Sequence, residues 1–367
     1  MFYTPPPPNV AEQEFHHDAP KIAIQHIERI HVQPRKFIPL AVMVVSIASF
    51  TIGVDAFSVA NPVDPSAAVT HQTTQSPQDV QAYWTPDRIR ETKAMPEPTA
   101  SARATAPSQT HLLPPMSAPG SPPANAHESG NGAASPADIS QSEVWTTHGR
   151  VPATTVGKLR FATGAGNAEC TASVITSANR SLIWTAGHCV SDGHGHWYSN
   201  FQFVPDYADG IEPLGSWVGK SVSTPKSWFN YRNPEYDFSA ITLWPQRDAK
   251  VADMTGSQGY KFNYGHDWNV YTFGYPFDTH PSRPGINGQQ LRYCIGGTWQ
   301  TGDLQSIHCD LGHGSSGGPW LDDLQLDRGW GYLVGNASHL VDESSDEVRS
   351  PHFGDAAVNV YEVQQNK

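Results

Sequence analysis

Three short stretches of the chain carry side chains that could perform acyl transfer. "WTAGHCV" places His188 after an apolar run, "EYDFSAITLW" places Asp237 at the start of another, and "GHGSSGGP" places Ser316 among glycines. A serine hydroxyl is a weak nucleophile until an imidazole takes its proton, and a buried carboxylate fixes the tautomer of that imidazole. Each residue alone is typical of a turn, but together they predict a catalytic triad of His188, Asp237 and Ser316.

The glycines around Ser316 need a physical reason, because glycine costs about 0.5–1 kcal/mol relative to alanine in regular structure. "HCDLGHGSSGGPW" is either a solvated turn or a loop whose backbone N–H groups converge beside Ser316. The pattern also fits the Gly-x-Ser-x-Gly elbow of α/β-hydrolases, in which a helix follows the serine. Gly317, Gly318 and Pro319 oppose such a helix. The chain order His, Asp, Ser also differs from the hydrolase order, so we exclude that fold.

The elements that must position these residues are predicted to be strands. Short runs rich in β-branched and aromatic residues alternate with turn residues from about residue 155 onward, as in "SLIWTAG", "HWYSNFQFV", "DFSAITLW", "WNVYTFGY", "LRYCIGGTW" and "GWGYLVGNAS". Many short strands with frequent turns are typical of an all-β sandwich or a pair of barrels. One helix is expected over 356–365, capped by Asp355.

Composition divides the chain into two very different parts. Twenty of its 31 prolines lie before Trp145, whereas ten of its 11 tryptophans lie from Trp145 onward. We therefore predict a folded catalytic domain over 145–367, which is long enough to bury a substantial core. Residues 55–144 are rich in Pro, Ala, Ser and Thr and are predicted to be a disordered spacer or pro-segment.

The N-terminal part predicts export. Residues 37–54 are uncharged and long enough to cross a bilayer at the short end of the range, and they follow a polar leader over 1–36. Arg35 and Lys36 precede the apolar stretch and Asp55 follows it, which places the leader in the cytoplasm. Whether the stretch is a cleaved signal or a retained anchor stays open. The expected location is secreted or extracellular, with the N-terminal segment in the membrane at least transiently.

Charge and cysteine content limit the partners. The formal net charge is −12 and no basic run is present, which argues against a nucleic-acid partner. The four cysteines, Cys170, Cys189, Cys294 and Cys309, form no CxxC pair, so no metal site and no cofactor are expected. In an exported chain they suggest two disulfides, for which three connectivities are possible. We expect a monomer.

The motifs "TAGHC", "YDFSAITL" and "GSSGGPW" resemble those of chymotrypsin-like serine peptidases, most closely the bacterial secreted branch related to glutamyl endopeptidases. The resemblance covers roughly 150–365 and implies an all-β fold of two packed six-stranded antiparallel β-barrels with a C-terminal helix, preceded here by a disordered N-terminal region. It implies His188 as general base, Asp237 as its orienting partner and Ser316 as nucleophile. It also implies an oxyanion hole from the N–H groups of Gly314 and Ser316, and the disulfides Cys170–Cys189 and Cys294–Cys309.

The sequence departs from the family at two places. Animal enzymes have an aspartate before the nucleophile that binds a new N-terminus, but Ser315 stands here, so latency must come from the leader or spacer. The pocket for the substrate side chain is open to three interpretations. In the first, Asp310 would favour cleavage after basic residues, because a buried carboxylate needs a partner. In the second, the pocket accepts small or apolar residues. Glutamate is the third, with Ser338 and His339 as pocket candidates, although Ala337 occupies the place of the family's histidine.

The sequence thus predicts an exported serine endopeptidase that hydrolyses proteins or peptides through an acyl-enzyme. The alternative is a catalytically inactive homologue that keeps the fold as a surface binding module. The preferred cleavage residue, the maturation site and the natural substrate are not determined by the sequence.

Overall fold

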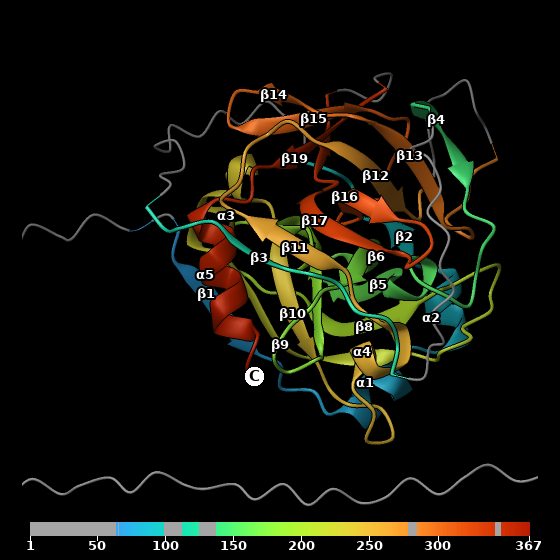
Figure 1. The fold of residues 1–367 in the computed structure, drawn as a ribbon. Helices are drawn as coiled ribbons and strands as arrows, with labels where there is room; N and C mark the ends of the chain where they lie inside the picture. The colour runs from blue at the N-terminus through green and yellow to red at the C-terminus, as the bar shows by residue number, and fades with distance from the viewer. Residues whose placement is uncertain (1–63, 65, 99–111, 125–136, 278–284, 342–345) are drawn as a thin grey trace, which may run out of the picture. The chain divides into compact units, whose positions relative to one another are not determined.

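The computed structural model describes residues 64, 66–98, 112–124, 137–277, 285–341 and 346–367. Strands dominate, and the expected all-β fold with a C-terminal helix is confirmed (Figure 1). The strand predictions are confirmed as well, because each of the six quoted stretches contains a strand. Between β4 and the C-terminal helix, the short helical segments that the structure describes are α3 (Lys226–Tyr231), α4 (Val251–Thr255) and the 3-10 turns η1 (Ala153–Thr155), η2 (Gly187–Cys189) and η3 (Pro234–Tyr236).

The first half of the domain is a closed antiparallel barrel. Its six strands pair in the order β5-β6-β7-β10-β9-β8, and β8 pairs again with β5 to close the ring. Their bounds are β5 (Val156–Thr163), β6 (Gly166–Val174), β7 (Leu182–Thr185), β8 (Ser199–Pro205), β9 (Trp217–Pro225) and β10 (Ser239–Leu243). Apolar residues such as Leu159, Phe203 and Ile241 fill its interior.

The second half consists of two sheets. A seven-stranded sheet has the order β3 (Met116–Ala118), β11 (Gly259–Phe262), β17 (Trp330–Asn336), β16 (Pro319–Gln325), β12 (Asn269–Gly274), β13 (Arg292–Gly297) and β4 (Ile139–Val144). A four-stranded sheet has the order β14 (Trp299–Thr301), β15 (Leu304–His308), β19 (Glu347–Pro351) and β18 (His339–Leu340). Unlike the first half, the seven-stranded sheet ends in edge strands.

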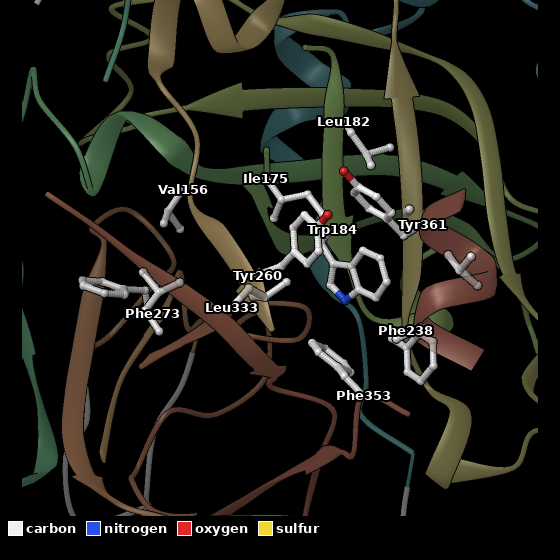
Figure 2. Packing of buried hydrophobic residues seen from close by; sticks show 14 of the residues in the cluster. Val156, Ile175, Leu182, Trp184, Phe238, Tyr260, Phe273, Leu333, Phe353 and Tyr361 are labelled. Atoms are coloured by element: carbon white, nitrogen blue, oxygen red, sulfur yellow. The ribbon is translucent and has the colours of Figure 1, made fainter. Parts of the chain in front are cut away.

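One aromatic cluster joins the two halves (Figure 2). Trp184 of β7 stacks on Phe238 at 5.7 Å between ring centroids and lies 5.2 Å from Phe262 of β11. Phe353, which follows β19, contacts the Trp184 ring edge-on at 5.3 Å. Aromatic pairs of this kind contribute about 0.5–1.5 kcal/mol each beyond the area that they bury. This aromatic packing therefore helps to fix the relative position of the halves.

The C-terminal helix α5 (Asp355–Gln364) lies on both halves, and its expected bounds are confirmed within one residue. Its capping residue was predicted wrongly. Gly354 is the N-cap, and the Asp355 carboxylate accepts instead from the backbone N–H groups of Leu112 and Leu113, at 2.7 and 3.1 Å. Asp355 thus ties an upstream segment to the domain.

The prediction of a disordered spacer over 55–144 is wrong for the residues that the structure describes within it. Regular elements occur at β1 (Ala68–Gln72), α1 (Pro77–Tyr83), α2 (Pro86–Arg90), β2 (Lys93–Ala94), β3 and β4. They share one compact unit with the barrels, so the folded part begins upstream of residue 145. These strands add to existing sheets through backbone hydrogen bonds, which need little apolar side-chain content.

Two signals in this segment could have been recognised from the sequence. Ser76 and Asp79 form a capping box at the start of α1, a pattern readable as S-x-x-D. Trp84, the one tryptophan upstream of Trp145, is buried with Val80 against Val218 of β9. A buried tryptophan is an anchor, and composition averaged over the segment conceals it.

The predicted leader 1–36 and apolar stretch 37–54 lie outside the described residues. In the part of the chain that the structure covers, none of the helices has the length and apolar character needed to cross a membrane.

Candidate active site

His188 and Asp237 meet at the adjacent ends of two paired strands of the closed barrel. His188 lies in η2 directly after β7, and Asp237 lies between η3 and β10, which pairs with β7. The Asp237 carboxylate contacts His188 twice: Oδ2 lies 2.7 Å from Nδ1, and Oδ1 accepts from the backbone N–H at 2.7 Å. Two contacts from one carboxylate fix both the ring and the backbone of the histidine. His188 Nε2 is the ring nitrogen that this carboxylate leaves unbound.

Two further residues extend this hydrogen-bond chain. Ser338 Oγ donates to Asp237 Oδ2 at 2.5 Å, and His339 Nδ1 lies 3.0 Å from the same hydroxyl. Because the Ser338 hydrogen points to Asp237, its oxygen accepts from His339, which therefore carries its proton on Nδ1. Burial lowers the pKa of His339 to about 4, so the ring is neutral at neutral pH. Ser338 and His339, the candidates for the substrate pocket, thus form a chain in which Ser338 contacts the Asp237 carboxylate and His339 contacts Ser338.

Ser316 lies on the loop between β15 and β16, held against the first barrel. Thr171 of β6 donates its backbone N–H to Ser316 O at 2.8 Å, and Cys189 Sγ lies 3.8 Å from the same oxygen. The loop passes so close to β6 that a side chain on Gly317 would overlap Thr185 Oγ1 at 2.1 Å and Thr171 O at 2.3 Å. Gly317 also has a φ of +81°, which L side chains rarely adopt. The glycine cluster therefore lets the loop of one half pack directly against β6 and Cys189 of the other, and Cys189 follows His188 in the chain.

Two backbone N–H groups of this loop lie on either side of Ser315, at Gly314 and Ser316. Gly314 and Ser316 are buried, and among the described residues neither backbone N–H donates to an acceptor, whereas Ser315, Gly317 and Gly318 all do. Gly314 has a φ of +95°, and a Cβ there would lie 2.7 Å from Tyr275 O. Buried donors without an acceptor are costly. Gly314 and Ser316 are the pair to which the family resemblance assigns the oxyanion hole.

The partner of the Ser316 hydroxyl comes from the N-terminal segment. Ser316 Oγ donates to Glu97 Oε1 at 3.3 Å, across 219 residues of sequence. His188 Nε2 has no hydrogen-bond partner among the described residues. Ser316 is 0 % exposed, His188 3 % and Glu97 8 %, so the site is covered. Sequence analysis missed Glu97, and no local pattern points to it.

Asp310 has a backbone partner. Its Oδ1 accepts from the N–H of Ser142 at 2.6 Å, and its own N–H donates to Ser140 O at 3.0 Å, so the residue is bound to β4. The argument for a basic substrate residue assumed a carboxylate without a partner. Because Ser142 supplies one, the Asp310 carboxylate does not require an arginine or lysine from the substrate.

The disulfides are those that the family resemblance implied. Cys170 bonds to Cys189 and Cys294 bonds to Cys309. The first joins β6 to the turn that holds His188, and the second joins β13 to the loop that leads to Ser316. Among the described residues, the two groups of closely spaced metal-ligating atoms both contain a disulfide pair, whose sulfurs are not thiolates.

Solved structures of two proteases are similar to this chain over their whole length. Protease Anisep from Arthrobacter nicotinovorans has 30% sequence identity and a TM-score of 0.56, and the match covers 62% of this chain and 100% of that one. The thermostable serine protease AL20 from an extremophilic microorganism has 28% identity and a TM-score of 0.54, with 59% and 99% covered. No protein-family model and no curated protein matches the sequence. More than a third of this chain has no counterpart in either protease.

Proposed function

The chain belongs to the chymotrypsin-fold serine proteases, and from that premise we propose that it is an exported endopeptidase that uses His188, Asp237 and Ser316 as its catalytic triad. The observation that carries the proposal is the pair of contacts between the Asp237 carboxylate and His188, beside the loop that presents Ser316 and the two N–H groups of the expected oxyanion hole. An inactive binding module would have no need for this arrangement.

The proposed reaction follows from these positions. Ser316 Oγ attacks the carbonyl carbon of the scissile bond, and its proton passes to His188 Nε2. The carbonyl oxygen becomes an oxyanion, which the N–H groups of Gly314 and Ser316 stabilise by about 2.7–4 kcal/mol per donor. His188 then protonates the leaving amine as the C–N bond breaks. Water, deprotonated by the same imidazole, hydrolyses the acyl-enzyme.

Asp237 contributes by orientation and charge. Its carboxylate holds the proton of His188 on Nδ1, which leaves Nε2 as the base. The same charge stabilises the imidazolium that forms during the reaction. Ser338 holds the carboxylate in place, and Asn336, whose Nδ2 donates to the backbone oxygen of Asp237 at 3.4 Å, holds the main chain.

Export is supported by the cysteines. All four are paired in disulfides, which form and persist in oxidising compartments. The sequence of residues 37–54 supplies the apolar segment that export requires. We include extracellular location in the proposal on these two grounds.

The test is hydrolysis of a mixed peptide library by single variants made in a Glu97→Ala background, because Glu97 contacts Ser316 in the full chain. Ser316→Ala and His188→Ala are each expected to lower kcat by about 10⁴-fold or more, because members of a triad act as a unit. Thermal unfolding of Ser316→Ala should be nearly unchanged, because only a hydroxyl is lost. His188→Ala leaves the buried Asp237 carboxylate without its imidazole partner and should unfold at a lower temperature. Ser315→Ala is the matched control, because the Ser315 hydroxyl donates to Gly312 O and not into the site. Unaltered activity in a folded Ser316→Ala variant would overturn the proposal.

A further inference from the structure

The N-terminal segment reaches the catalytic serine along a defined route. β2 extends the barrel as a parallel strand, with Ala94 beside Glu169 of β6, and Met95 donates its N–H to Glu169 O at 3.0 Å. Two residues further along β6, Thr171 holds the carbonyl of Ser316. Strands advance about 3.3 Å per residue. The register of β2 on β6 therefore carries Glu97 to Ser316.

Several independent contacts hold the segment that carries Glu97. β1 pairs with β9 over five residues, from Ala68 opposite Pro225 to Gln72 opposite Ser221. Trp84 Nε1 donates to Asn200 O at 2.8 Å, and Tyr83 OH donates to Asn167 Oδ1 at 2.7 Å. A tethered group has an effective concentration in the millimolar range, so even a weak contact at Ser316 is kept occupied.

The atom presented to Ser316 is not a scissile carbonyl. It is a side-chain carboxylate oxygen, Glu97 Oε1. A carboxylate is a poor acyl donor, because its attack by a hydroxyl would have to expel an oxide. It does accept a hydrogen bond well, since bonds to a charged acceptor are about twice as strong as neutral ones. The Ser316 proton is thereby directed to Glu97 and not to His188 Nε2.

From these contacts we infer that residues 93–98 are a built-in inhibitor of the protease, in which the Glu97 carboxylate occupies the catalytic centre and holds the Ser316 hydroxyl. The inference rests on the proposed function. It assigns the latency that the sequence led us to expect from the upstream region to one segment of that region. Pro96 and Pro98 flank Glu97. They restrict the backbone on both sides, which keeps the carboxylate directed at the serine. The full chain is a latent form, and release of this segment activates it.

Labelling with a fluorescent fluorophosphonate tests the inference on the full-length chain. In this reaction Ser316 Oγ forms a bond to phosphorus, fluoride leaves, and the serine proton passes to His188. The label is read from the full-length band on a gel, which excludes any chain that was cleaved during expression. Glu97→Ala is expected to raise the labelling rate at least about tenfold, the value of one charge-assisted hydrogen bond.

Two variants and one control separate the role of the carboxylate from that of the strand. Glu97→Gln keeps the shape without the charge and should give an intermediate rate. Met95→Pro removes the N–H that bonds to Glu169 and should also raise the rate, although Glu97 is still present. Glu91→Ala is the control, because Glu91 is exposed on the same segment and should label like wild type.

The outcomes distinguish this inference from the proposed function. Fast labelling of Glu97→Ala with slow labelling of wild type supports both, provided that Ser316→Ala in the Glu97→Ala background abolishes it. Equal labelling of wild type and Glu97→Ala, dependent on Ser316 in both, overturns the inhibitor and keeps the protease. Slower labelling of Glu97→Ala also overturns it, because Glu97 would then assist the reaction. If Ser316 is labelled in no variant, the proposed function is wrong as well.

Discussion

His188 and Asp237 come from the closed barrel, whereas Ser316 and Ser338 come from the half that is built of two sheets. In the barrel every strand has two partners within the ring, so the histidine and its carboxylate are positioned within one rigid unit. The serine sits on a loop and reaches them only through contacts between the halves, such as the bond from Thr171 N–H to Ser316 O.

The N-terminal segments contact these two halves differently. On the barrel they add to strands that already have partners, as β1 does on β9. In the second half they form both edges of the seven-stranded sheet, β3 beside β11 and β4 beside β13. Unpaired sheet edges invite association with other chains. The upstream segments therefore complete the second half, while on the first half they deliver Glu97 to the site.

The largest loss of kcat is expected for a substitution in the barrel, and it tests whether the barrel alone positions the histidine and its carboxylate. Asp237→Asn is expected to lower kcat of the active form by about 10⁴-fold, because an amide favours the wrong tautomer of His188. Ser338→Ala removes a hydrogen bond to the same carboxylate from the other half and should cost only about tenfold. Steady-state kinetics on one peptide substrate measures both. Equal losses in the two variants would mean that the barrel does not position Asp237 by itself.

Removal of the disulfides compares the halves directly. Each bridge closes a loop, of 19 residues in Cys170–Cys189 and 15 in Cys294–Cys309. Either double Cys→Ala variant should therefore lose about 3 kcal/mol of unfolding free energy in urea. Loss of Cys294–Cys309 should lower kcat more than loss of Cys170–Cys189, because the loop from Cys309 to Ser316 contains no strand, whereas the turn that holds His188 is also fixed by Asp237. A drop in kcat for the barrel bridge alone would contradict the comparison.

The smallest expected effect is acid sensitivity that originates in the second half. Burial lowers the pKa of His339 from 6.5 to about 4, so between pH 6.5 and 5 the unfolded chain binds a proton that the folded chain does not. Stability must then fall with pH over this range, by about 2 kcal/mol from this group. Urea unfolding at pH 6.5 and 5 should show a smaller loss in His339→Asn. Identical losses in wild type and variant would exclude His339 as the source.

Local patterns predicted the parts of the fold that depend on local forces. The strands and the C-terminal helix follow from apolar periodicity and turn residues. The roles of His188, Asp237 and Ser316 were proposed from short motifs, in which the residues next to each of them in the sequence also belong to the pattern. Gly317 is an example: the space at its position admits no side chain, so the residue type itself indicates how closely the loop packs there.

The upstream segment shows where such reading fails. Its averaged composition predicted disorder, yet Trp84 and Val80 are buried and its short strands pair with the barrel and the sheets. Strand addition uses backbone N–H and C=O groups, which every sequence possesses. Composition therefore carries no record of whether a sheet edge will be present to receive them.

By itself, the sequence determined the two-part β fold, the residues able to form a triad and the likeness that implied the disulfide pairs. Only the tertiary structure decided that Asp310 binds the backbone of Ser142, that Ser338 bonds to Asp237, and that Glu97 holds the hydroxyl of Ser316. The physical reason is the length of chain between the partners, 168, 101 and 219 residues. Such contacts depend on how the whole chain closes in space, and no pattern within either local stretch encodes them.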